Sequence, residues 1–179
     1  MRFAALAALL ALGACQWDPP HQGARDSSVP PLTVEGYGAM HIGMSLADAR
    51  TASGQALNAP GIDDDPNGCL EQQFQTTDGD KLFLMFEAGR LTRITASEGA
   101  PHTRTAQNVG VGSTDAEVRT AYQNLAEQPA KYADAPAHDL IAWSDAAHQS
   151  GIRFEIDAAG KVTAVHAGGP SIIYVEGCA

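Results

Sequence analysis

Two segments of the chain repeat the same pattern about 70 residues apart. Residues 42–50 (IGMSLADAR) align with residues 111–119 (VGSTDAEVR), an offset of 69. Residues 86–94 (FEAGRLTRI) align with residues 157–165 (DAAGKVTAV), an offset of 71. A period of this length is typical of two copies of one supersecondary unit, although two unrelated segments of the same general type can resemble each other by chance. We therefore expect a tandem repeat.

Each copy begins with a helix signal. Ser45 stands three residues before Asp48, and Thr114 stands three residues before Glu117. In such a capping box the hydroxyl accepts a hydrogen bond from a free backbone N–H, and the carboxylate reaches back to the cap residue. The expected helices cover residues 45–53 and 114–125.

Strand patterns follow each predicted helix. Leu82, Leu84 and Phe86 occupy alternate positions, which places them on one face of a strand. Ala88-Gly89 and residues 157–160 are typical of hairpin turns. The expected strands are 69–75, 81–87 and 90–96 in the first copy, and 139–144, 151–156, 161–167 and 171–176 in the second. A helix followed by an antiparallel meander, twice over, predicts an α+β fold.

The first residues predict export. Arg2 precedes an apolar run at residues 3–12, and Leu12-Gly13-Ala14 leads to Cys15. This is the layout of a signal peptide, here residues 1–14. The residues before Cys15 resemble the lipobox of bacterial lipoproteins, which implies a diacylglycerol on the Cys15 thiol and cleavage before it. The alternative is an ordinary signal peptide cut after Ala14.

The predicted mature chain has a tether and a globular part. Residues 15–31 contain four prolines and small polar residues, which is typical of an extended linker. Residues 32–179 are expected to fold as one domain, with repeats at about 32–105 and 106–179. By resemblance to the enterobacterial sorting rule, Gln16 after the lipidated cysteine implies the outer membrane, facing the periplasm.

The composition excludes one class of partner. The chain has 21 acidic and 11 basic residues, and its net charge is −10. Nucleic acid and anionic headgroups need clustered Lys and Arg, which the sequence lacks. Beyond the signal peptide, no apolar stretch reaches the 18–20 residues of a transmembrane span. The expected membrane contact is therefore the acyl chains on Cys15 alone.

Two cysteines remain once Cys15 is lipidated. In an exported, oxidising setting, Cys69 and Cys178 are expected to form a disulfide rather than a metal site or a nucleophile. The bridge would close a loop of about 110 residues, which the chain-entropy model values at about 4–5 kcal/mol.

The two-copy layout resembles two known groups. Residues 41–45 (HIGMS) are similar to the segment that opens the helices of the small outer-membrane lipoprotein of the β-barrel assembly machinery. The layout also resembles the β-lactamase inhibitory protein family, which has two tandem units of a helix and a four-stranded sheet. Both resemblances imply a fold, and no contact residue of either group maps onto this chain.

One segment is a weak candidate for calcium. Asp63, Asp65 and Asn67, followed by Gly68, match the first half of a calcium-binding loop. The twelfth position is Phe74 instead of a bidentate Glu, so a solvated acidic turn is the favoured interpretation. The six histidines have no metal-ligand spacing and are expected at the surface or at strand edges. No cofactor is expected.

The sequence contains no recognisable catalytic motif. Gly43-Met44-Ser45 and Gly112-Ser113 do not complete a nucleophile elbow, and the hydroxyls suit helix caps instead. Trp143 and Tyr132 are candidate ligand contacts, able to stack on a sugar or to anchor a protein. We expect a non-catalytic envelope lipoprotein that binds a protein partner, as an assembly accessory or an inhibitor-like module. The alternatives are a lectin-like protein that binds a glycan, and an uncatalogued hydrolase.

Overall fold

The computed structural model describes residues 29–55, 57 and 68–178. The predicted signal peptide, Cys15 and most of the predicted linker lie outside the described residues. The calcium candidates Asp63, Asp65 and Asn67 lie outside them as well. The fold and the candidate site therefore rest on the globular part of the chain.

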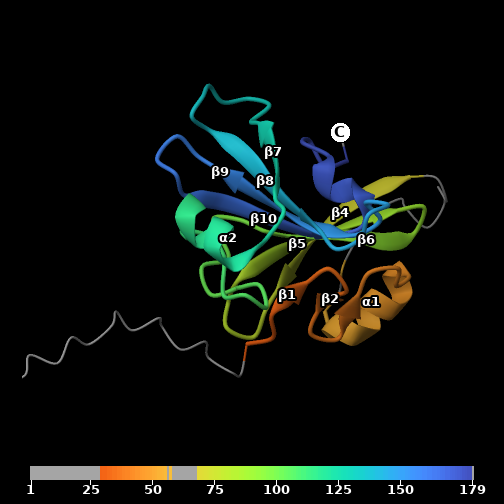
Figure 1. Cartoon of the computed structure of the whole chain (residues 1–179). Coiled ribbons are helices and arrows are strands. Elements are labelled where there is room, and N and C mark those ends of the chain that lie inside the picture. The colour runs from red at the N-terminus through yellow and green to blue at the C-terminus, as the bar shows by residue number, and fades with distance from the viewer. Residues whose placement is uncertain (1–28, 56, 58–67, 179) are drawn as a thin grey trace, which may run out of the picture.

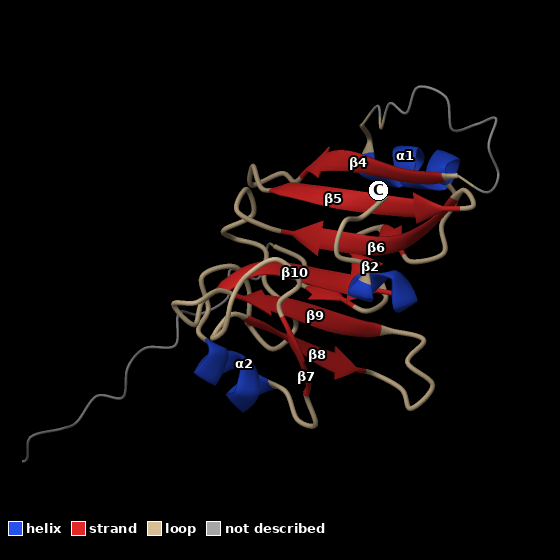
Figure 2. Ribbon diagram, turned by 90° about the horizontal axis from the view of Figure 1, so that it is seen from above, coloured by secondary structure: helices blue, strands red, loops and turns tan. Residues whose placement is uncertain are grey.

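A seven-stranded antiparallel sheet forms the centre of the molecule (Figure 1). Seen from above, its strand order is β4-β5-β6-β10-β9-β8-β7 (Figure 2). A small three-stranded sheet has the order β1-β2-β3. The elements are β1 (Leu32–Thr33), β2 (Gly36–Tyr37), β3 (Met40–His41), α1 (Leu46–Ser53), β4 (Cys69–Gln75), β5 (Lys81–Glu87), β6 (Arg90–Ala96), α2 (Asp115–Ala121), β7 (Ala126–Pro129), β8 (His138–Trp143), β9 (Gly151–Ile156), β10 (Val162–Gly168) and the 3₁₀ helix η1 (Pro170–Ile173).

The two faces of the large sheet have different coverings. The small sheet and α1 lie on one side, and the C-terminal segment lies on the other (Figure 1). Alternate strand residues point toward the helices, and they form the main core with residues of α1 and α2. Fully buried members of this core are Leu46, Ala49, Leu82, Leu84, Phe86, Ile94, Val118, Leu140, Phe154 and Val165.

Both predicted helices are present and both cap hydroxyls bind as predicted, but the complete capping box forms only at the second helix. The Ser45 hydroxyl accepts a hydrogen bond from the Asp48 N–H at 3.1 Å. Thr114 and Glu117 form a complete capping box, because the Glu117 carboxylate also accepts from the Thr114 N–H at 2.6 Å. The prediction that the second helix reaches residue 125 is wrong. The helix ends at Ala121, and the next residue, Tyr122, has an extended backbone. Its ring packs against that of Phe154, with the ring centroids 5.1 Å apart.

The segment before each helix is held in the same way in both halves of the chain. The Gly43 N–H donates to Leu91 O at 2.7 Å, and the Gly112 N–H donates to Val162 O at 2.8 Å. Both glycines have a positive φ, 89° and 84°, which other residues rarely adopt. Each helix thus starts beside the last hairpin of its own half.

The predicted strands of the central sheet are confirmed to within one residue, with one exception. The prediction of a strand at 171–176 is wrong. Residues 170–173 form η1, and the chain then crosses the face of the sheet instead of pairing with an edge. Pro170 lacks an N–H, and the carbonyls of this segment bind arginine side chains, so no ladder forms there. The mixed helix and sheet, mostly strand, is compatible with the α+β prediction.

Candidate functional site: the C-terminal strap

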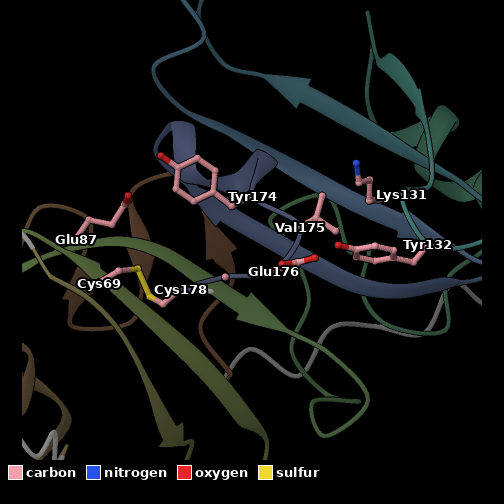
Figure 3. A pocket seen from close by; sticks show the side chains of 9 residues that line it. Cys69, Glu87, Lys131, Tyr132, Tyr174, Val175, Glu176 and Cys178 are labelled. Atoms are coloured by element: carbon pink, nitrogen blue, oxygen red, sulfur yellow. A yellow bond between two sulfur atoms is a disulfide. The ribbon is translucent and has the colours of Figure 1, made fainter.

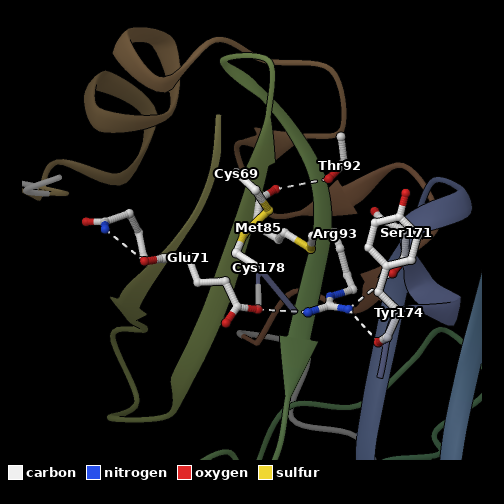
Figure 4. The surroundings of a disulfide bond; sticks show 9 residues. Cys69, Glu71, Met85, Thr92, Arg93, Ser171, Tyr174 and Cys178 are labelled. Carbon is white, nitrogen blue, oxygen red and sulfur yellow. Dashed lines mark hydrogen bonds and ion pairs between the residues drawn. A yellow bond between two sulfur atoms is a disulfide. The ribbon is translucent and has the colours of Figure 1, made fainter. Parts of the chain in front are cut away.

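Residues 170–178, which we call the strap, lie over the sheet face opposite α1. Two buried arginines hold them there (Figure 4 shows the first). Arg93 in β6 donates to Ser171 O at 3.1 Å and to Tyr174 O at 3.0 Å. Arg153 in β9 donates to Ile172 O at 2.9 Å and to Tyr174 O at 3.3 Å. Because guanidinium groups offer several fixed donors, the two side chains fix the strap backbone at three carbonyls.

Carboxylates on neighbouring strands balance the two buried cations. Glu71 in β4 pairs with Arg93 at 2.7 Å. Asp139 in β8 lies 3.3 Å from Arg153, and Glu155 forms a close ion pair with it. Burial raises the pKa of Asp139, although the nearby Arg153 opposes the shift. A polar network thus runs across the sheet beneath the strap.

His166 in β10 joins this network and corrects a prediction. The sequence predicts histidines at the surface or at strand edges, but His166 lies within β10 and is buried between Thr95 and Glu155. Its Nδ1 lies 2.9 Å from Thr95 Oγ1, and its Nε2 lies 3.0 Å from Glu155 Oε1. The hydrogen bond from His166 lowers the pKa of Glu155 from 4.5 to about 2. Burial lowers the pKa of His166, so we assign a neutral imidazole that donates to an ionised Glu155.

Thr95, His166 and Glu155 are connected as in a hydroxyl–imidazole–carboxylate relay. In such a relay, however, the hydroxyl is exposed to the substrate. Thr95 and His166 are 8% and 7% exposed, and neither lines the cleft described below. A nucleophile must reach a reacting atom of the substrate, so these groups as placed serve to satisfy each other's hydrogen bonds.

The predicted disulfide is present. Cys69 and Cys178 are joined, with a Cα–Cα distance of 5.3 Å (Figure 4). Cys69 begins β4, the edge strand of the first half, and Cys178 lies at the end of the strap. The bridge therefore fastens the strap to the sheet at the end opposite η1.

An open cleft of about 420 Å³ lies beside the strap (Figure 3). Lys131 and Tyr132 reach it from the loop between β7 and β8, and Glu87 reaches it from the end of β5. The strap and the disulfide supply the remaining lining residues, which are Cys69, Tyr174, Val175, Glu176, Gly177 and Cys178.

Exposed apolar side chains gather on the strap and beside it. Tyr132 is 70% exposed, Ile173 45%, Tyr174 43% and Val175 42%. Together with Phe83 in β5, these are the exposed large apolar residues among the described positions. We call Tyr132, Ile173, Tyr174 and Val175 the strap patch. Since three of its members are consecutive on a segment fixed at both ends, the patch is held in place before anything binds.

The structure separates the two aromatic residues that the sequence analysis paired. Tyr132 lines the cleft, whereas Trp143 does not. Trp143 ends β8 half-buried, and its ring stacks on His148 with centroids 4.5 Å apart. The second aromatic residue that lines the cleft is Tyr174 and not Trp143.

Sequence analysis missed Arg93, Arg153 and the strap itself. A usable signal was present, because Arg93 stands between Thr92 and Ile94 and Arg153 stands between Ile152 and Phe154, and a charged residue with such neighbours in a strand is unusual. An arginine buried in a strand needs acceptors, and the carbonyls of an irregular segment can supply them.

Comparisons with known proteins give one remote likeness. No family model matches the chain, and no curated protein matches it. Among solved structures, a cysteine-rich secretory protein from Staphylococcus aureus has a TM-score of 0.42 and 14% sequence identity. The likeness covers 80% of this chain and 48% of that protein, so the match spans about half of that protein's length.

The described residues contain two α-helices, both short. Neither helix within them is long and apolar enough to cross a bilayer.

Proposed function

We propose that this protein is a cell-envelope lipoprotein, anchored through acyl chains on Cys15 and facing the periplasm from the outer membrane. Its folded part is a non-catalytic module that binds a protein partner. The strap patch is the surface that makes the contact. An assembly accessory and an inhibitor-like domain are the two roles that such a module would fill.

The observation that carries this proposal is the strap patch. Aromatic residues that are exposed next to aliphatic ones are typical of the centre of a protein interface. Here they stand beside a cleft whose rim carries Lys131, Glu87 and Glu176, so polar groups surround an apolar centre. The strap would lose little conformational entropy on binding, because two arginines and a disulfide already order it.

We also propose that the fold consists of two tandem repeats, residues 32–105 and 106–179. The corresponding hydrogen bonds of Gly43 and Gly112, and the corresponding caps at Ser45 and Thr114, support this interpretation. The two meanders meet where β6 pairs with β10 in the middle of the sheet. The second unit has one strand more in the large sheet, β7.

Glycan binding is the second candidate. Tyr132, in the loop between β7 and β8, and Tyr174, in the strap, both line the cleft and could stack on a sugar ring. The carboxylates of Glu87 and Glu176 are able to accept hydrogen bonds from sugar hydroxyls. This candidate replaces the expected Trp143 by Tyr174. The hydrolase alternative has less support, since Thr95 and His166 are buried and do not line the cleft.

Site-specific photocrosslinking in intact cells tests the proposed interface. A photoreactive phenylalanine analogue at Tyr174 is expected to trap one discrete protein partner. The matched control carries the same analogue at Ala116, which is exposed on α2 away from the strap. Equal products from both positions, or a glycan and no protein recovered from Tyr174, would contradict the proposal.

The proposed anchor has its own test. Mass spectrometry of the mature N-terminus is expected to show Cys15 as the first residue, carrying a diacylglycerol. A Cys15→Ser variant is expected to lose membrane attachment while it keeps the disulfide. A mature chain that starts elsewhere and carries no lipid would refute the anchor and leave the strap patch to be judged separately.

A further inference from the structure

Three groups able to bind a metal ion meet at the turn between β4 and β5. They are distant in sequence from the strap patch. Asp78 and Asp80 belong to the turn between β4 and β5, and His102 follows β6. One ligand atom from each residue lies within 4.8 Å of the other two. We propose that Asp78, Asp80 and His102 form a binding site for a divalent transition-metal ion such as Zn²⁺. This inference is independent of the proposed function.

The backbone brings these residues together. The Lys81 N–H donates to Gly99 O at 2.8 Å, which fastens the start of β5 to the segment after β6. The Thr76 N–H donates to Asp80 O at 2.9 Å and closes the turn that carries both aspartates. The site therefore belongs to ordered elements, and its ligands come from two segments 22 residues apart.

Asp80 is oriented as metal-binding carboxylates commonly are. It is 1% exposed, and its Oδ2 accepts from the Thr103 N–H at 2.6 Å, the Thr103 hydroxyl at 2.7 Å and the His102 N–H at 3.0 Å. Its Oδ1 lies 2.9 Å from His102 Nδ1. Such outer contacts hold a ligand in place and are a regular part of metal sites.

The other two groups leave the site open to solvent. Asp78 is exposed, and the His102 side chain is 62% exposed. Two carboxylates and one imidazole form a mixed oxygen and nitrogen donor set, which suits Zn²⁺ and related ions better than Ca²⁺ or Mg²⁺. With three protein ligands, a fourth position would remain for water.

The same turn contains a further buried polar group. Thr76, in the same turn, is 6% exposed, and its hydroxyl makes no hydrogen bond of ordinary geometry within the described part of the chain. It lies near the Tyr37 hydroxyl. Burial, and then the negative charges of Asp78 and Asp80, raise the pKa of Tyr37 to about 12. A bound cation would balance this concentration of negative charge.

Calorimetric titration of the purified, tag-free protein with Zn²⁺ tests the site. We expect one ion per chain in the wild type. Asp78→Asn and His102→Gln each remove an exposed ligand, and we expect at least about tenfold weaker binding in both. Asp78→Asn is the cleaner variant, because His102→Gln also removes the contact between His102 Nδ1 and Asp80 Oδ1. The matched control is His138→Gln, because His138 also faces an aspartate, with its Nε2 3.5 Å from Asp115 Oδ1. This control is expected to bind as the wild type does.

Thermal unfolding supplies a second measurement that does not depend on calorimetry. Zn²⁺ at about 0.1 mM should raise the unfolding temperature of the wild type and of His138→Gln, since an ion that binds the native state stabilises it. The rise should disappear in Asp78→Asn. No binding by the wild type, or equal binding by wild type, Asp78→Asn and His102→Gln, would overturn the proposal. Equal binding would place the ion elsewhere on the chain.

Discussion

Arg93 and Arg153 donate to the same atom, the carbonyl oxygen of Tyr174, at 3.0 and 3.3 Å. Two buried cations that share one acceptor repel each other, so each needs an anion on its outer side. Glu71 provides it for Arg93, and Glu155 with Asp139 provides it for Arg153. The two arginines, each paired with carboxylates, thus meet at the Tyr174 carbonyl, and we call this arrangement the clamp; the strap patch depends on it.

Removing one arginine from the clamp should destabilise the fold. Arg93→Met leaves the Glu71 carboxylate, whose side chain is 37% exposed, without its cation, and it removes one of the donors to Ser171 O and one of the donors to Tyr174 O. We expect a loss of about 3 kcal/mol in the free energy of unfolding, measured by urea denaturation. Arg119→Met is the control, because Arg119 forms exposed pairs with Asp115 and Glu127, worth below about 1 kcal/mol. Equal losses in both variants would refute the clamp.

The disulfide should contribute most of its stability through the unfolded chain. In the double variant Cys69→Ala/Cys178→Ala, the described sheet should form as before, since its ladders do not depend on the bridge. The free energy of unfolding should fall by about 4–5 kcal/mol on the chain-entropy model. Limited proteolysis should then cut the strap near Tyr174 faster than any site in the sheet. A strap that stays resistant would mean that the arginines alone hold it.

Glu155 should make stability depend on pH in the acid range. Its pKa falls from 4.5 to about 2 in the native state, so the unfolded chain binds the proton first. The contribution is complete above pH 4.5 and is lost as the pH falls toward about 2. Because Glu155 is partly exposed, we expect only about 1–2 kcal/mol. Urea denaturation at a series of pH values should show wild type and Glu155→Gln converging near the lower limit. A constant difference would contradict the assignment.

His166 should make the stability of the fold depend on pH in a higher range than Glu155 does. Burial lowers its pKa below 6.5, so the unfolded chain binds a proton while the native imidazole stays neutral. Stability should therefore decline as the pH falls below 6.5. His166→Gln should remove this decline and also narrow the acid range in which Glu155 acts, because the hydrogen bond from His166 is the largest cause of the low Glu155 pKa. The check is the slope of unfolding free energy against pH in the two proteins, and identical slopes would rule out a neutral buried imidazole.

The two helix caps allow a comparison between the halves of the chain. Thr114→Ala and Ser45→Ala should each cost about 1 kcal/mol. The loss should be larger for Thr114, because its cap is a complete box with Glu117, whereas the Asp48 carboxylate at the first helix accepts from the Ser45 hydroxyl instead of the cap N–H. Urea denaturation of both variants provides the measurement. A larger loss at Ser45 would contradict this ranking.

Local signals in the sequence were sufficient for much of the fold. Caps at Ser45 and Thr114 gave the helix starts, and alternating apolar residues such as Leu82 and Leu84 gave the strands. The disulfide followed from counting cysteines in an exported chain. These features depend on a few neighbouring residues or on chemistry that leaves one pairing, so a single sequence carries them.

The strap and its arginines needed information that is not local. Residues 171–176 contain Ile, Tyr and Val, which is a strand composition, yet their carbonyls bind side chains from β6 and β9. His166 looked like a strand-end residue, and its burial depends on Glu155 and on Thr95 from the other half of the chain. The metal candidate likewise joins Asp78 and Asp80 to His102 across a turn, at a spacing that no linear motif describes.

The bridge between Cys69 and Cys178 also determines how the molecule would respond to mechanical tension. A pull applied between residue 32 and residue 178 would pass through the sulfur–sulfur bond, so the strands from β5 to β10 would lie outside the stressed path. Among the described elements, only the small sheet and α1 lie on that path. Apart from Cys69 and Cys178, the residues that line the cleft and form the strap patch would therefore not carry the load.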